Sequence, residues 1–225
     1  MSFFIHPAAA RRQLVELAEG DITNTDLARG ALLIALEEYP RLDVEGYLAR
    51  LDDLAGRAAA RGSASDPPVF RLGHLHAEMF DIDGYHGDEQ NYYDVRNAYL
   101  NEVIDRRAGL PITLSIVFLH VAARIGLNAH GVGLPGHYIV KVQFELNEVY
   151  VDPFHGGTTL TFAEIGELLS GMSAGQMRLS REHLRGWSAR ETLLRVLGNL
   201  QSMYARAGEG RKAAAARERM EILSG

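Results

Sequence analysis

Apolar residues recur at helical spacing through the first part of the chain. Leu27, Ala31 and Ile34 stand at positions i, i+4 and i+7, which is one face of a helix. Pro40 ends this segment, and the stretch 61–68, rich in Gly, Ser and Pro, is a clear break. The pattern predicts a helical N-terminal region. One expected helix begins at Pro7. The others cover residues 27–38, 44–55, 69–80 and 94–107.

The central part of the chain changes character at Ile112. From Ile112 to Ile125 apolar residues occur on every side of the expected helix, which is typical of a helix buried in the centre of a domain. Two segments rich in β-branched residues follow, and we interpret residues 137–145 and 148–152 as strands joined around residues 146–147. Helices followed by a small antiparallel sheet predict an α+β fold.

The C-terminal part returns to helical spacing. A short helix is expected over residues 161–169, and two longer helices over residues 187–206 and 211–223. The glycine-rich turn at 208–210 joins the last two in a hairpin that resembles one tetratricopeptide unit. Such repeats normally need about three copies for stability. We therefore expect the hairpin to pack on the core or on another copy of the chain, with Trp187 as a packing residue between tail and core.

Composition narrows the class of protein. The 225 residues can bury a sizeable core and suggest one domain, or one domain with an appendage. A formal net charge of −6 argues against nucleic acid or an anionic membrane as partner. The absence of cysteine from the sequence excludes disulfides, thiolate metal sites and thiol catalysis. Residues 1–6 lack the features of a signal peptide, and no apolar run reaches the ~18 residues of a membrane span. We expect a cytoplasmic protein without a cofactor.

The most informative residues are His137 and Asp152. His137 begins one expected strand and Asp152 ends the next, downstream of the buried helix, which is the order of a cysteine–histidine–aspartate triad. Side chains alternate along a strand, so parity places both residues on one face of the sheet. A two-residue loop would leave them roughly 13 Å apart along the strands, and a four-residue loop would shorten that offset by about 7 Å. We expect a His137–Asp152 pair, and the other interpretation is a His137 ring bonded to backbone.

Several short motifs occur in a characteristic order. They are Gly-Leu-Pro-Ile-Thr-Leu-Ser at 109–115, Gly126-Leu127, Pro135-Gly136-His137 and Asp152-Pro153, with the segment 97–103 before them. In this order and spacing the chain resembles the transglutaminase-like superfamily, and most closely its bacterial SirB branch. The resemblance implies a transglutaminase-like, papain-like core at residues 91–175. A helical region at 1–90 precedes this core, and a tetratricopeptide-like tail at 176–225 follows it.

The resemblance also implies a nucleophile that this chain lacks. In active members a thiolate at the N-terminus of the buried helix is activated by the helix dipole and a neighbouring imidazolium. That position falls at Pro111 or within one residue of it, and proline has no nucleophile. The hydroxyls of Thr113 and Ser115 are the nearest candidates. With His137 as the base and Asp152 as the residue that orients it, the implied catalytic set is vestigial or uses an alcohol.

Other candidate sites carry less weight. His74 and His76 resemble a metal-binding pair, but no third ligand at diagnostic spacing accompanies them, and we expect no metal. The acidic stretch 81–89 has some features of a calcium loop without its ligand spacing, so we interpret it as a solvated loop. Three tyrosines in and after this stretch are candidates for lining a binding cleft. They are Tyr85, Tyr92 and Tyr93.

Three functions remain open on this basis. The leading hypothesis is a non-catalytic protein that binds a polypeptide or partner protein through the former active-site cleft. The first alternative is a hydrolase or acyltransferase that uses Thr113 or Ser115 with His137 and Asp152. The second is a structural scaffold that forms a homo-oligomer through its helical tail. The missing cysteine favours the leading hypothesis and the scaffold, whereas the presence of His137 and Asp152 favours the enzyme.

Overall fold

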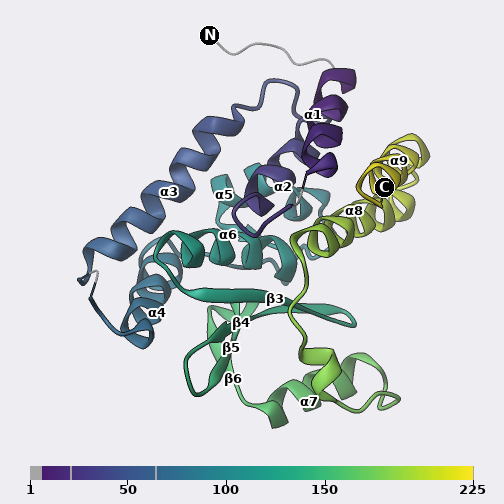
Figure 1. The fold of residues 1–225 in the computed structure, drawn as a ribbon. Helices are drawn as coiled ribbons and strands as arrows, with labels where there is room; N and C mark the ends of the chain where they lie inside the picture. The colour runs from purple at the N-terminus through teal and green to yellow at the C-terminus, as the bar shows by residue number, and fades with distance from the viewer. Residues whose placement is uncertain (1–6, 21, 64, 225) are drawn as a thin grey trace.

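Helix α6, Pro111–Arg124, lies between a four-stranded sheet and the N-terminal helices (Figure 1). Every residue from Pro111 to Ala122 is buried, because apolar side chains face both layers. This confirms the central buried helix and the α+β fold predicted from the sequence. The computed structural model describes residues 7–20, 22–63 and 65–224. Residues 1–6, on which the expectation about a signal peptide rests, lie outside the described residues.

Helices from the first half of the chain cover one side of α6. They are α1 (Pro7–Glu19), α2 (Leu27–Ala35), α3 (Val44–Ala60), α4 (Pro68–His76) with a π-helical extension (Ala77–Ile82), a 3-10 turn (Val95–Ala98) and α5 (Leu100–Arg106). The predicted periodicity places Leu27, Ile34 and Leu51 in the core, where each is at most 1% exposed. Two short strands, β1 (His86–Gly87) and β2 (Ala108–Gly109), form a separate parallel pair beside this layer.

The sheet has the strand order β3-β4-β5-β6, and all neighbours are antiparallel. Its elements are β3 (Asn128–Leu134), β4 (His137–Gln143), β5 (Glu148–Asp152) and β6 (Thr158–Leu160), and α7 (Phe162–Met172) and a 3-10 turn (Arg181–Leu184) follow them. Alternation gives the sheet two apolar faces. Val140 and Val142 belong to the main core with α6, whereas Ile139 packs with Ile165 of α7 and Leu184. The sheet is therefore covered on both sides.

The loop between β4 and β5 decides where Asp152 lies. Gln143 pairs with Glu148, so residues 144–147 form a four-residue loop. This is the longer of the two loops considered above. It brings Asp152 about two residues, or roughly 7 Å, nearer to His137 than a two-residue loop would.

Two predicted helices differ in the structure. The expected helix over residues 94–107 is interrupted at Tyr99, whose ψ of 121° is extended. Tyr99 is 1% exposed, and its hydroxyl lies 2.8 Å from that of Tyr204, so packing overrides the helical pattern at this residue. The expected helix over residues 69–80 is α-helical only to His76 and continues as a π-helix.

Strands β3 and β6 of the sheet were not predicted, nor was the short pair β1 and β2. Gly131 and Gly133 give β3 a low strand propensity, yet close packing requires a glycine in this strand. A Cβ on Gly133 would lie 2.1 Å from the ring of Trp187. The strand therefore exists because of a contact with a residue more than fifty positions away, which local periodicity does not reveal.

The tail packs on the core of its own chain. Its helices are α8 (Ala189–Arg206) and α9 (Gly210–Ser224). Tyr138 Oη lies 2.7 Å from Thr192 Oγ1, and Arg219 Nη1 donates a 2.7 Å hydrogen bond to the carbonyl of Ile34. The expected packing of the hairpin on the core is confirmed, and Trp187 lies edge-on to Tyr138 at the junction. Among the described helices, none has the length and hydropathy to cross a membrane.

The docked tail leads to a stability prediction. Leu197 is 0% exposed in the main core, so Leu197→Ala should lower the free energy of unfolding by about 2–5 kcal/mol. Leu146→Ala is the matched control, because Leu146 is 99% exposed and should change nothing measurable. Urea unfolding of both variants tests this. Equal stability of the two variants would show that the tail does not share the core.

Candidate functional site

His137 is positioned by a tight turn at the start of β4. Leu134 pairs with His137 across the hairpin, and Pro135 and Gly136 form the two-residue connection. Gly136 has φ +75°, a conformation that residues with a Cβ rarely adopt. The Pro-Gly pair thus fixes His137 as the first residue of the strand. Its side chain is 4% exposed.

Asp152 ends β5 and holds His137 by a short hydrogen bond. His137 Nε2 lies 2.7 Å from Asp152 Oδ2, and Asp152 is 1% exposed. The other carboxylate oxygen, Oδ1, accepts bonds from the backbone N–H of Phe154 at 3.0 Å and of His155 at 3.4 Å. Asp152 is therefore the N-cap of the 3-10 turn Pro153–His155. The carboxylate is fixed by backbone on one oxygen and by an imidazole on the other.

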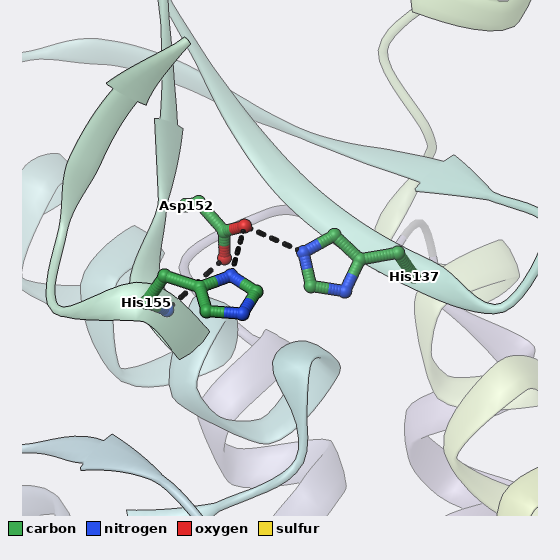
Figure 2. A group of neighbouring side chains, drawn as sticks. All are labelled: His137, Asp152 and His155. Carbon is green, nitrogen blue, oxygen red and sulfur yellow. Dashed lines mark hydrogen bonds and ion pairs between the residues drawn. The ribbon is translucent and has the colours of Figure 1, made fainter. Parts of the chain in front are cut away.

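A second histidine, His155, completes the cluster. Its Nδ1 lies 2.8 Å from Asp152 Oδ2, the same oxygen that His137 contacts. Figure 2 shows the carboxylate between the two imidazole rings, with the free Nδ1 of His137 pointing away from it. The side chain of His155 is 47% exposed, so it forms the solvent side of the cluster.

His155 was missed by the sequence analysis, although a signal for it exists. A capping Asp with a His three residues later fits one 3-10 turn, and two glycines then follow. Both glycines have positive φ, 65° at Gly156 and 76° at Gly157. A Cβ on Gly157 would lie 2.3 Å from the ring of Phe80. The turn that carries His155 is therefore followed by two positions at which glycine is needed.

The electrostatics of the cluster favour an ionised carboxylate. Burial raises the pKa of Asp152, but the hydrogen bonds and charges of His137 and His155 outweigh burial, and the pKa lies below its ordinary value. An ionised carboxylate can only accept hydrogen bonds. Both imidazole nitrogens that face Asp152 Oδ2 are therefore donors.

The expected nucleophile position lies close to His137. Pro111 is the first residue of α6, where its missing N–H costs nothing. With Ile112 it lines a cavity of about 100 Å³, to which His137, Tyr138 and Gly136 also contribute. The remaining lining residues are Tyr92, Arg195 and Asn199. We call this cavity the His137 recess. The start of α6 and His137 thus face one another, and the residue types at the helix start are unreactive.

The two candidate hydroxyls lie elsewhere. Thr113 Oγ1 accepts a 3.0 Å bond from the N–H of Leu110 and donates one of 2.8 Å to the carbonyl of Asn97, so it caps the helix start. Ser115 Oγ is buried without a hydrogen-bond partner among the described residues. Neither hydroxyl forms a hydrogen bond with His137. The alcohol-based set predicted as an alternative is therefore not assembled around His137.

The remaining candidates are dispersed. His74 contacts Asp66 at 3.3 Å, and His76 lies 3.7 Å from Asp81. Within the part of the chain that the structure describes, His137, Asp152 and His155 are the one group of three His, Asp or Glu side chains with metal-ligand spacing. Of the three tyrosines proposed for a cleft, Tyr92 lines the His137 recess.

Comparison with known proteins identifies the family and the relatives to which this chain is similar. A profile of the Transglutaminase-like superfamily matches residues 45–198. A UPF0162 protein of Xylella fastidiosa is 32% identical over 207 residues, which cover 91% of this chain and 74% of that protein. A UPF0162 protein of Vibrio cholerae is 26% identical over 194 residues, covering 86% of this chain and 72% of that protein. F-box only protein 21 of Mus musculus is 27% identical over 142 residues, 58% of this chain and 21% of that protein. No solved structure matches the chain significantly.

The two hydroxyls give opposite stability predictions. Thr113→Val removes a buried, bonded hydroxyl and should lower the free energy of unfolding by about 1–3 kcal/mol. Ser115→Ala removes a buried hydroxyl without a partner, so the free energy of unfolding should stay unchanged or rise. Urea unfolding of the two variants measures both effects. A loss for Ser115→Ala as large as that for Thr113→Val would contradict this assignment.

Proposed function

We propose, on the premise that this chain belongs to the transglutaminase-like superfamily, that it binds a polypeptide without reacting with it. The binding site is the former active-site cleft, of which the His137 recess is the innermost part. A partner protein would present an extended segment to this cleft. The family indicates where the site lies, and the residues of this chain indicate that no reaction takes place there.

One observation carries the proposal. The helix start that faces His137 presents Pro111 and Ile112, and the nearest hydroxyls are occupied or out of reach. Nucleophilic catalysis needs a nucleophile within hydrogen-bond reach of its base. Among the described residues, His137 forms no hydrogen bond with the hydroxyl of Thr113 or Ser115, and the recess beside it is open. An open cleft without a nucleophile beside the histidine is better suited to binding a polypeptide than to catalysing a reaction on it.

The lining of the His137 recess suits a peptide. Asn199 is half-buried, and its amide forms no hydrogen bond with any described residue, so it can both donate to and accept from a peptide backbone. Tyr92 supplies an aromatic wall. A volume of about 100 Å³ equals roughly three liquid waters, since each occupies about 30 Å³. The recess thus has room for one small side chain rather than a whole ligand.

The finer assignments are also part of the proposal. The motif order supports the bacterial SirB branch, and the α8–α9 hairpin supports a tetratricopeptide-like tail. The location we propose is the cytoplasm. The enzyme alternative lacks a hydroxyl at His137, and the scaffold alternative loses its exposed apolar stripe because the tail packs on its own core.

A selection from a random peptide library tests the proposal. Peptides enriched on the wild-type protein should bind the Asn199→Leu variant about tenfold more weakly or worse, because the leucine removes the amide and narrows the recess. Asn147→Leu is the matched control, since Asn147 is exposed in the β4–β5 loop and far from the recess in the sheet register. Mass spectrometry of the peptides after incubation should show no change of mass.

Three outcomes would contradict the proposal. The first is a peptide that is cleaved or modified by the wild-type protein. The second is an equal effect on affinity in the two variants, whether both lose affinity or neither does. The third is a library that yields no peptide above the background of the bare support.

A further inference from the structure

The cluster around Asp152 has more imidazole than a triad requires. In a catalytic triad one carboxylate orients one imidazole. Here Asp152 Oδ2 is contacted by His137 Nε2 at 2.7 Å and by His155 Nδ1 at 2.8 Å. The three atoms lie within 4.8 Å of one another, and they come from the start of β4, the end of β5 and the following turn (Figure 2). Two histidines and one carboxylate are a common ligand set for divalent transition metals.

The distances need only a small adjustment to accept an ion. Zn²⁺ binds imidazole nitrogen and carboxylate oxygen at about 2.0–2.2 Å, which places neighbouring ligand atoms about 3.0–3.5 Å apart. The two contacts to Asp152 Oδ2 would therefore lengthen by less than about 1 Å. His155 can supply this movement, because its side chain is 47% exposed, whereas His137 and Asp152 are buried. Backbone bonds to Oδ1 keep the carboxylate oriented during the change.

The protonation of the two imidazole rings is also compatible with a bound metal ion. Without metal, His137 carries its proton on Nε2 and His155 on Nδ1, since both nitrogens donate to the carboxylate. With metal, each neutral imidazole holds its proton on the other ring nitrogen and uses the freed lone pair for the ion. Each ring therefore gives up the proton on the nitrogen that faces Asp152 when the ion binds, while its other nitrogen can carry one.

A second carboxylate lies where a metal-bound His155 needs one. Glu89 Oε1 is 4.0 Å from Nε2 of His155, the nitrogen that would carry the proton in the metal-bound form. Metal-bound histidines usually donate this second N–H to a carboxylate, carbonyl or water, which fixes the ring. Glu89 is therefore placed to orient His155 and to add negative charge near the ion.

The cluster opens to space for further ligands. A cavity of about 590 Å³ borders Asp152 and His155, and Glu164 and Glu167 of α7 contribute to its wall. Three protein ligands leave at least one coordination position, which would face this cavity. The acidic wall favours approach of a cation. Water or a carboxylate or carbonyl of a bound molecule would complete the coordination.

We propose that His137, Asp152 and His155 form a binding site for one divalent transition-metal ion of the Zn²⁺ class. Mg²⁺ and Ca²⁺ are excluded as its ions, because they require oxygen ligands and two of the three ligands are imidazoles. The site shares His137 with the His137 recess. Neither proposal is a premise of the other, so either can fail while the other holds.

Calorimetric titration of the chelator-treated full chain with Zn²⁺ tests the site. The wild-type protein should bind one ion per chain, and His155→Asn should weaken binding at least about tenfold. His74→Asn is the matched control, since His74 lies outside the cluster and contacts Asp66. It should bind Zn²⁺ with wild-type affinity. Mg²⁺ should give no one-to-one binding to any of the three proteins.

A spectroscopic measurement guards against an effect on folding. His155 is half-exposed in a short turn, so His155→Asn should still unfold in one cooperative urea transition, which shows that the variant is folded. Co²⁺ added to the wild-type protein should give the visible absorption of a low-coordinate site with nitrogen ligands, and His155→Asn should abolish this absorption. The proposal is overturned if the wild type binds no Zn²⁺, if His155→Asn binds it equally well, or if His74→Asn is the variant that loses it.

Discussion

The hydrogen bond from His137 to Asp152 ties the beginning of β4 to the end of β5, and the geometry of the site depends on it. The bond is 2.7 Å long between two side chains that are 4% and 1% exposed. It exists because the β4–β5 loop has four residues and because Gly136 permits the turn before His137. A carboxylate this buried is stable only when paired. Two imidazoles and two backbone N–H groups supply that pairing.

The surroundings of this bond separate the chain from a thiol enzyme. In the catalytic arrangement the free nitrogen of the histidine meets a nucleophile at the helix start. In this chain Pro111 and Ile112 occupy that place, and Thr113 holds the helix start together instead. A cavity remains on each side of the cluster, one beside His137 and one beside His155. The chain thus combines the transglutaminase-like scaffold with a proline at the start of α6.

Much of the fold follows from local patterns, and its exceptions follow from distant contacts. Apolar residues on all sides of 112–125 suffice to predict α6, and alternation suffices for β4 and β5. Periodicity cannot reveal β3, in which Gly133 leaves room for the ring of Trp187. Nor can it reveal the break at Tyr99, whose hydroxyl makes a buried contact with Tyr204.

The candidate site, like the fold, could be predicted from the sequence only in part. Strand parity placed His137 and Asp152 on one face, but the loop length that brings them into contact is a property of the fold. His155 was missed because an exposed histidine in a turn has no periodic signature. Only its spacing from Asp152, which caps that turn, links it to the cluster.

Nitrogen-15 NMR of the histidine side chains tests the central claim most directly, namely that ionised Asp152 directs both rings. The spectrum is recorded in metal-free protein. We predict a proton on Nε2 of His137 and on Nδ1 of His155, the two nitrogens that face Asp152 Oδ2. Asp152→Asn should alter both spectra. A His137 whose Nε2 carries no proton, or spectra that do not respond to Asp152→Asn, would contradict this claim.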